Sequence, residues 1–455
     1  MSRLLISAAH KSSGKTTVSL GLCAALAERG LVVQPFKKGP DDIDPLWLGQ
    51  AAGRPCHNLD FYCMAHEEIL AAVGQYSGDA DISLIEGNKG LYDGLDLHGS
   101  NSNAALATLT HTPVILVLDA RGMTRGIAPL ILGYQGFDPA VKIAGVILNQ
   151  LGGSRHEAKL RAVIEHYTDV PVVGGVHRNP DLIIDERHLG LIPSNEASTA
   201  EKKIIDIRNR IRDQVDLEQL QAVAGQDTLD YTPTPPPQGI TRPVVRVGIA
   251  HDAAFGFYYP DDLAALAQAG AELVPFSTLT DPSLPAVDGL FIGGGFPESH
   301  LQTLAGNTAL RADIRKAIKD GLPAYAECGG LMYLSRSIVW NGSQSDMVGV
   351  IPADTVMHAR PQGRGYVQLR ETAHAPWPSD APAGKFAAHE FHYSSLENIT
   401  EPLTYAYEVL RGTGVDGSHD GIVINKLLAC YSHMRDTRQH HWARRFVAFV
   451  RSHSN

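Results

Sequence analysis

One cysteine of this chain has surroundings that suggest chemistry. Cys328 is followed by two glycines in the stretch YAECGGLMYL, residues 325–334, where a short apolar run meets a predicted helix. Glycines at such a turn let the backbone bend sharply and present the thiol to solvent. The alternative is a small apolar residue at a strand end, which would need no glycine pair. The position therefore predicts a nucleophile on a strand-to-helix turn.

Two further stretches supply the other parts of such a site. The run GLFIGGGFPESH places Gly294 and Gly295 after a predicted strand, where backbone N–H groups can form an oxyanion hole. The run LLACYSHMRD ends another strand near His433, which is either a base or an ordinary surface histidine. A cysteine, an oxyanion strand and a histidine base together predict acyl transfer from an amide.

The N-terminal stretch LLISAAHKSSGKTTV predicts a phosphate-binding loop between a strand and a helix. Backbone N–H groups around Gly14 and Thr17 would hold phosphates, Lys15 would reach the β and γ oxygens, and the Thr16 hydroxyl would bind Mg²⁺. Ala9 stands where the usual pattern has its first glycine, so the match is imperfect.

Two acidic loops follow at the ends of the next predicted strands, FKKGPDDIDP and IEGNKGLYDG. Their carboxylates belong to Asp41, Asp42, Asp44, Glu86 and Asp93. Because the carboxyl ends of parallel strands meet at one edge of a sheet, these groups are expected to converge beside the phosphate loop. Mg-ATP chemistry needs such hard oxygen ligands, whereas either loop alone would be a solvated turn.

Apolar runs that alternate with helical segments must position these groups. The alternation occupies the chain up to residue 230 and restarts after residue 244. It predicts parallel sheets covered on both faces by helices. The intervening DYTPTPPPQGITRP has five prolines and is typical of a semi-rigid linker. We predict two α/β domains, 1–230 and 244–455, joined by a linker at 231–243.

Composition limits the partners of the protein. The net charge of −10 argues against binding to nucleic acid or to an anionic membrane surface. The five cysteines are scattered, odd in number and without metal-site spacing, which predicts a reduced, cytoplasmic protein. The apolar run at the N-terminus breaks at His10 and Lys11, so it is too short for a signal peptide or a membrane span and is expected to be a buried strand.

Along nearly its whole length the sequence resembles the cobyrinate a,c-diamide synthase family. The stretches that carry the resemblance are SSGKTTV, KGPDDIDP, AGRPCHNLD, IEGNKGLYDG, LNQLGG, ERHLGLIP, FGFYYPDDL, GGGFPESH, YAECGGLMYL and HEFHYS. The family joins a dethiobiotin-synthetase-like P-loop amidoligase domain to a class I glutamine amidotransferase domain. The resemblance implies amidation of the a and c acetate groups of a tetrapyrrole through an acyl phosphate. ATP and Mg²⁺ would be the cofactors and glutamine the amide donor, and a homodimer is a candidate assembly.

The resemblance also implies roles for particular residues. It assigns nucleotide binding to Gly14, Lys15, Thr16, Thr17 and Asn149, and metal binding to Thr16, Glu86 and Asp41. It makes Cys328 the nucleophile, His433 its base, and Asp41 and Asp93 further catalytic acids. Expected substrate or oxyanion contacts are Lys38, Asp42, Asp44, Lys89, Gly294, Gly295, Arg364 and His392. Arg364 and His392 suit a polycarboxylate macrocycle, although their stretches are equally typical of ordinary strand edges.

Several residues depart from the family pattern beside the expected substrate. Asp42 replaces a tyrosine, Lys38 an aliphatic residue, and Asn88 and Lys89 the usual Val-Met. The two added lysines suit a macrocycle with more carboxylates, by about 1 kcal/mol after solvent screening, whereas Asp42 opposes the effect. The set resembles the branch linked to dissimilatory sulfite reductase, which amidates sirohaem, and the resemblance makes sirohaem the expected substrate, with cobyrinate as the alternative.

Two questions remain open from the sequence. Class I amidotransferases often have a carboxylate two residues after the histidine, but Arg435 stands there, so the third member of a triad is unassigned and a Cys–His dyad is the alternative. A non-enzymatic alternative is a P-loop nucleotide switch with an inert amidotransferase-like domain. The retained Cys328 argues against that alternative, and glutaminase activity would discriminate the two.

Overall fold

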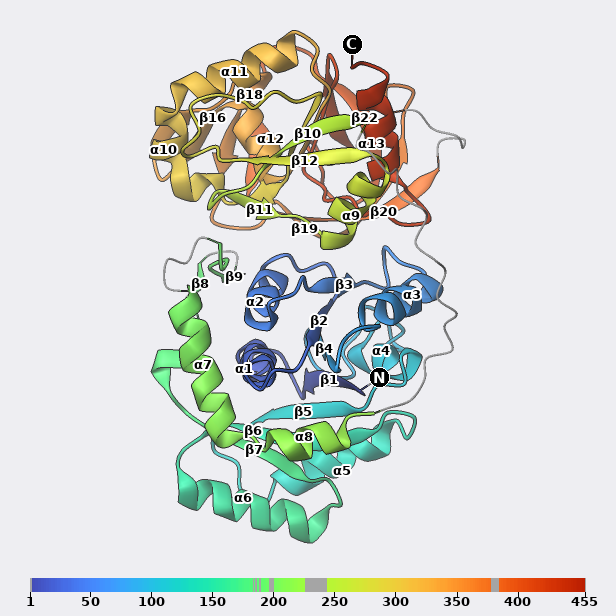
Figure 1. Ribbon diagram of the computed structural model, residues 1–455, viewed down its shortest axis with the longest axis vertical. Coiled ribbons are helices and arrows are strands. Elements are labelled where there is room, and N and C mark those ends of the chain that lie inside the picture. Colours follow the sequence, from blue (N-terminus) through green and yellow to red (C-terminus); the bar gives the residue numbers. More distant parts are fainter. Residues whose placement is uncertain are drawn as a thin grey trace. The chain divides into compact units, whose positions relative to one another are not determined.

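The computed structural model describes residues 2–182, 184, 186–187, 190–195, 200–225, 244–377 and 384–454. The chain divides into two units, Met1–Thr234 and Pro235–Asn455, which are coloured along the sequence in Figure 1. The predicted proline-rich linker, 231–243, lies outside the described residues. No helix within the described ranges is long and apolar enough to cross a membrane.

The first unit contains a seven-stranded sheet in the order β3-β2-β4-β1-β5-β6-β7. All neighbouring strands pair in parallel. The strands are β1 (Ser2–Ala8), β2 (Val33–Lys38), β3 (His57–Leu59), β4 (Ile82–Glu86), β5 (Val114–Asp119), β6 (Ile143–Leu151) and β7 (Val172–His177). β2 and β4 are buried at every position, as expected for strands that are covered on both faces.

Helices cover both faces of this sheet. On β1, Leu4 and Ile6 join one apolar core and Leu5 joins the other, because successive side chains of a strand point to opposite faces. The first core contains α1 (Lys15–Glu28), α2 (Ile43–Ala52), α7 (Ala200–Gln214) and α8 (Leu217–Val223). The second contains α3 (His66–Tyr76), α4 (Asn103–Leu109), α5 (Ile127–Phe137) and α6 (Ser154–Tyr167). Figure 1 shows α1 and α2 on one side of β2 and β4, and α3 on the other.

Three short elements lie between β7 and α7 in the described part of the chain. They are the 3-10 helix η1 (Pro180–Leu182) and the strand pair β8 (Glu186–Arg187) and β9 (Gly190–Leu191). The seven parallel strands and the helices that pack on both sides of them confirm the predicted parallel sheet for this unit.

The second unit contains a nine-stranded sheet in the order β12-β10-β13-β15-β24-β23-β22-β19-β20. The strands from β12 to β24 pair in parallel, and those from β24 to β20 pair antiparallel. They are β10 (Val245–Ala250), β12 (Ala271–Phe276), β13 (Gly289–Ile292), β15 (Ala324–Glu327), β19 (Gly363–Glu371), β20 (Lys385–His392), β22 (Thr404–Arg411), β23 (His419–Ile424) and β24 (Leu427–Cys430). The predicted α/β class is confirmed, with an antiparallel extension that the apolar runs alone did not indicate.

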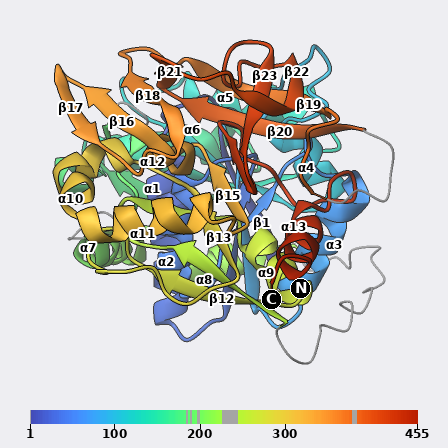
Figure 2. The same cartoon turned by 90° about the horizontal axis from the view of Figure 1, so that it is seen from above.

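The remaining elements of the second unit pack on this sheet. α9 (Pro260–Gln268) and α13 (Trp442–Arg451) share one core and lie side by side in Figure 2. The other core takes in α10 (Leu301–Gly306), α11 (Thr308–Lys319) and α12 (Gly329–Leu334). A small sheet joins β16 (Ser335–Trp340), β17 (Ser343–Asp346), β18 (Ile351–Met357) and β21 (Ser394–Glu397), while β11 (Phe255–Phe257) pairs with β14 (Gly294–Gly295); η2 (Pro297–His300) follows β14.

Candidate active sites of the two units

The loop before α1 has the geometry of a phosphate-binding loop. Gly14 caps α1 with φ 86°, and a Cβ on Gly14 would lie 2.1 Å from Nδ2 of Asn149. That amide donates to the carbonyl oxygen of Ser13 at 2.8 Å, so Asn149 braces the loop from β6. α1 begins at Lys15, and Thr17 is its third residue. Burial lowers the pKa of Lys15, and Glu86 acts against this shift.

A cluster of hard oxygen ligands lies at the start of α1. The Thr16 hydroxyl donates to Oε1 of Glu86 at 2.8 Å and to Oδ2 of Asp44 at 3.4 Å. Oε2 of Glu86 is buried without a hydrogen-bond partner among the described residues. One hydroxyl and two carboxylates, including the oxygen of Glu86 that accepts no hydrogen bond among the described residues, fit a Mg²⁺ ion. The donor set therefore suits the metal that phosphoryl transfer requires.

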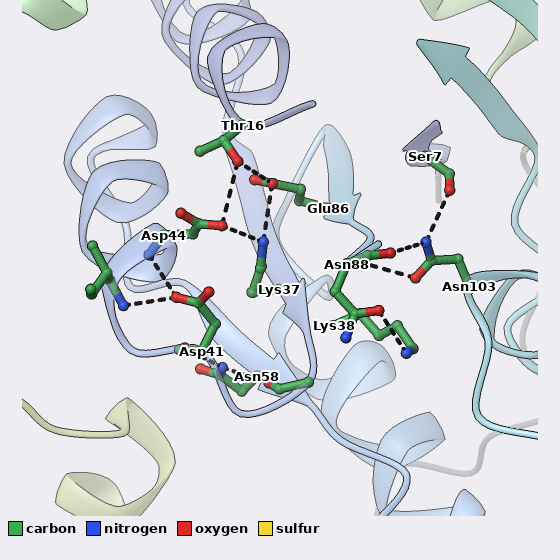
Figure 3. Close-up of polar contacts among 12 residues, drawn as sticks. Ser7, Thr16, Lys37, Lys38, Asp41, Asp44, Asn58, Glu86, Asn88 and Asn103 are labelled. Carbon is green, nitrogen blue, oxygen red and sulfur yellow. Dashed lines mark hydrogen bonds and ion pairs between the residues drawn. The ribbon is translucent and has the colours of Figure 1, made fainter. Parts of the chain in front are cut away.

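Lys37 bridges the two carboxylates of this cluster, and the sequence analysis did not select it. Its Nζ lies 3.0 Å from Oε1 of Glu86 and makes a short ion pair with Asp44. Figure 3 shows all three side chains turned towards one another beside Thr16. Although burial lowers the pKa of Lys37, Asp44 and Glu86 raise it well above its ordinary value. The lysine is thus a fixed positive charge next to the phosphate-binding loop.

The predicted acids Asp41, Asp44 and Asp93 make different contacts. Asp41, which the resemblance made a metal ligand, accepts hydrogen bonds through Oδ1 from the backbone N–H groups of Ile43 and Asp44, both at 2.9 Å. The contact with Thr16 comes from Asp44 instead. Asp93 accepts a hydrogen bond from the backbone N–H of Gly90 at 2.9 Å. Its negative charge acts to raise the pKa of Lys15, against the effect of burial.

Two of the residues that depart from the family pattern contact each other. Nζ of Lys38 donates to Oδ1 of Asn88 at 2.9 Å. The backbone N–H of Asn88 donates to Asn103, which in turn donates to Ser7 at 3.0 Å (Figure 3). Burial lowers the pKa of Lys38 to about 8. Lys89 follows Asn88 with φ 42°, and Asp42 stands at the start of α2. The end of β2 therefore carries an amine held in place by the end of β4.

Cys328 occupies a strained turn between β15 and α12. Its φ of 47° and ψ of −102° are unusual for a residue with a side chain. A Cβ on Gly329 would lie 2.8 Å from the carbonyl oxygen of Gly295, and one on Gly330 would lie 2.1 Å from that of Ile292. The glycine pair is therefore needed for α12 to pack tightly on β13 and β14.

The thiol itself is enclosed rather than open to solvent. Cys328 is 7% exposed, and its Sγ lies 3.8 Å from the carbonyl oxygen of Phe391 on β20. The expectation that the turn presents the sulfur to solvent is wrong, because the antiparallel part of the sheet covers it.

His433 lies against the glycine-rich strand. It follows β24 and exchanges backbone hydrogen bonds with His389, at 3.2 and 2.7 Å, and the two rings stack at 4.8 Å. A Cβ on Gly294 would lie 2.6 Å from Cε1 of His433, and Gly295 adjoins the turn after Cys328. The structure thus gathers the predicted nucleophile turn, oxyanion strand and histidine in one place.

Arg364 and His392 differ in their surroundings. The Arg364 guanidinium is exposed and lies 5.5 Å from the centre of the Phe391 ring. The His392 side chain is only 2% exposed, stacks on Tyr431 at 3.9 Å and contacts the carbonyl oxygen of Ser394 through Nδ1 at 2.8 Å. A substrate contact through His392 would require this packing to open, whereas Arg364 stays a predicted contact.

These features define the class of the protein: a P-loop nucleotide-binding domain followed by a class I glutamine amidotransferase domain. Residues 5–192 match the family described as "CobQ/CobB/MinD/ParA nucleotide binding domain". Residues 246–439 match the "CobB/CobQ-like glutamine amidotransferase domain". The predicted domain types and their order are thereby confirmed.

Comparison with curated proteins identifies the family. The cobyrinate a,c-diamide synthase of Magnetococcus marinus is 45% identical over 99% of this chain and 97% of its own length. The enzyme of the same name from Methanosarcina acetivorans is 42% identical over 95% of this chain and 92% of its own. The chain belongs to the cobyrinate a,c-diamide synthase family. It is therefore an enzyme of the glutamine-dependent carbon–nitrogen ligase class, as predicted.

Proposed function

We propose that the protein uses ATP and glutamine to amidate peripheral acetate groups of a tetrapyrrole, with the a and c acetates of cobyrinate as the first candidate substrate. The observation that carries the proposal is the presence of two separate reaction centres in one chain. The cluster of Thr16, Glu86 and Asp44 suits phosphoryl transfer, and the turn at Cys328 beside His433 suits glutamine hydrolysis. The relatives named for cobyrinate support the substrate.

The first centre activates the carboxylate. An acetate oxygen attacks the γ-phosphorus of ATP, ADP leaves, and an acyl phosphate results. Lys15 and Lys37 supply positive charge for the transferred phosphoryl group. Mg²⁺ bound to Thr16, Glu86 and Asp44 would add charge neutralisation. Ammonia then attacks the acyl carbon, and phosphate leaves.

The second centre supplies the ammonia. Cys328 gives its thiol proton to His433 and attacks the glutamine amide, while backbone N–H groups of the glycine-rich strand stabilise the oxyanion. The imidazolium returns the proton to the departing ammonia. Water hydrolyses the thioester, releases glutamate and restores the thiol.

Sirohaem, which the sequence analysis favoured, is the second candidate substrate because the named relatives support cobyrinate, and one observation still supports it. Lys38 and Asn88, which both depart from the family pattern, form a hydrogen bond at 2.9 Å. Lys38 thus places an amine, held by Asn88, where the family usually has an aliphatic side chain. A positively charged amine favours a substrate that carries more carboxylates.

A side-by-side assay tests the substrate. Cobyrinate and sirohaem are incubated separately with the purified chain, ATP, Mg²⁺ and glutamine, and the product masses are measured. The proposal predicts two amidations of cobyrinate at a higher kcat/KM than for sirohaem. Preferred amidation of sirohaem would transfer the assignment to the second candidate, and no amidation of either would refute the proposed function.

A further inference from the structure

The position that often carries the orienting carboxylate of a class I amidotransferase holds a cation here. Arg435 stands two residues after His433, and its guanidinium lies 4.0 Å from the centre of the Tyr259 ring. Its Nη2 lies 3.2 Å from Oδ2 of Asp261. The Arg435 side chain is 2% exposed and fixed in these contacts, so this position brings no carboxylate to the histidine.

A different carboxylate faces the imidazole. Oε2 of Glu327 lies 3.7 Å from Nδ1 of His433, and the two side chains are 5% and 4% exposed. Glu327 is the last residue of β15 and directly precedes the nucleophile Cys328. The separation is that of an ion pair rather than a hydrogen bond, and catalytic contacts are often long before substrate binds.

The carboxylate of Glu327 is held so that only one oxygen faces the ring. Its Oε1 accepts a hydrogen bond from the backbone N–H of Met434 at 2.9 Å and another, short one from the hydroxyl of Tyr325. The Tyr325 ring is itself packed among Phe291, Trp377 and Trp442. One oxygen is therefore anchored by two donors from a rigid core, and the other is directed at His433.

We infer that Glu327 is the positioning residue of the glutaminase centre, the third member beside Cys328 and His433. The inference rests on the proposed glutaminase function. The carboxylate favours the tautomer with a proton on Nδ1, which leaves Nε2 as the base for the thiol proton, and it stabilises the imidazolium once formed. The thiolate–imidazolium pair is then more populated than in a Cys–His dyad.

A second imidazole packs on that of His433 within this unit. His389 stacks on it from β20, and Nδ1 of His389 lies 3.2 Å from the hydroxyl of Tyr259. Asp261 is engaged with Arg435. Within the described part of this unit, the carboxylate of Glu327 lies against Nδ1 of His433.

The test compares Glu327→Gln with a matched control, Glu371→Gln. Glu371 also pairs with a histidine, since its Oε1 lies 3.6 Å from Nε2 of His440, and its side chain is 9% exposed. Glutamate release and the pH profile of Cys328 alkylation by iodoacetamide are measured on the full-length chain, with Cys328→Ser as the alkylation background. Amidation driven by ammonium salts is measured in parallel.

The inference predicts that Glu327→Gln lowers the kcat of glutaminase by roughly 10²-fold or more, with a smaller change in KM. The alkylation midpoint should move to higher pH, because the imidazolium that stabilises the thiolate loses its counter-ion. Ammonium-driven amidation should be retained, and Glu371→Gln should show the wild-type midpoint.

An unchanged alkylation midpoint and glutaminase rate in Glu327→Gln would overturn the inference. Equal loss of the glutamine-driven and ammonium-driven activities, with a lower melting temperature, would assign Glu327 a structural role and overturn it as well. Failure of the proposed tetrapyrrole amidation is distinguishable, because it would appear in the wild-type chain while glutaminase and alkylation still report on Glu327.

Discussion

Replacement of Gly330 by alanine tests how tightly the nucleophile turn is packed. The new Cβ would lie 2.1 Å from the carbonyl oxygen of Ile292, where ordinary contact begins at 3.4 Å. The backbone of β13 is fixed by its pairing with β10 and β15, so the start of α12 must move by about 1 Å. Overpacking of this kind costs about 1–3 kcal/mol of stability.

The shift would displace Cys328 from the oxyanion strand. A misplacement of about 1 Å in a reacting group costs roughly 100-fold in rate, so we expect the glutaminase kcat/KM of Gly330→Ala to fall by that factor. Ammonium-driven amidation should stay at the wild-type rate. Gly306→Ala is the matched control, because nothing lies within 4 Å of a Cβ there. Wild-type glutaminase in Gly330→Ala would refute the packing argument.

Three further predictions concern charged groups. Glu86→Gln should lower amidation with glutamine and with ammonium alike, by ~10²-fold or more, and spare glutaminase, as product analysis would show; loss of glutaminase would contradict it. Lys37→Met removes the cation from the buried carboxylate of Glu86 and the partly buried one of Asp44, so the free energy of unfolding should fall by about 3–5 kcal/mol. Mg²⁺ should then raise the melting temperature of this variant more than that of the wild type, and equal shifts would contradict the metal site. Burial opposes the shift, but His440 and Arg445 lower the pKa of Glu371 to about 2. The stabilising effect of this carboxylate is therefore full above about pH 5 and is lost as pH falls towards 2, so the melting temperatures of Glu371→Gln and wild type should converge over that range.

Local features of both centres could be predicted from the sequence. The phosphate-binding loop depends on consecutive residues and on the left-handed conformation of Gly14, and the nucleophile turn depends on the glycines after Cys328. Alternating apolar runs likewise indicated the parallel sheets, because strands covered on both faces need continuous apolar sequence.

The contacts that the sequence did not reveal depend on strand register. Lys37 pairs with Glu86 because β2 and β4 align these two positions. Glu327 reaches the segment after β24 because β15 aligns it with Cys430, three residues before His433. Such pairings join residues far apart in the chain, so no local pattern marks them.

In the proposed function, the centre at Cys328 releases ammonia from glutamine, and the centre at Thr16 and Glu86 uses that ammonia to amidate the tetrapyrrole. The most direct measurement compares Cys328→Ala with wild type, using glutamine and then ammonium chloride as the nitrogen source, with ATP, Mg²⁺ and the tetrapyrrole. Glutamine-driven amidation should fall by ~10³-fold or more, since the nucleophile is absent, whereas ammonium-driven amidation should keep the wild-type rate. Equal loss with both nitrogen sources would contradict the division of labour between the two units.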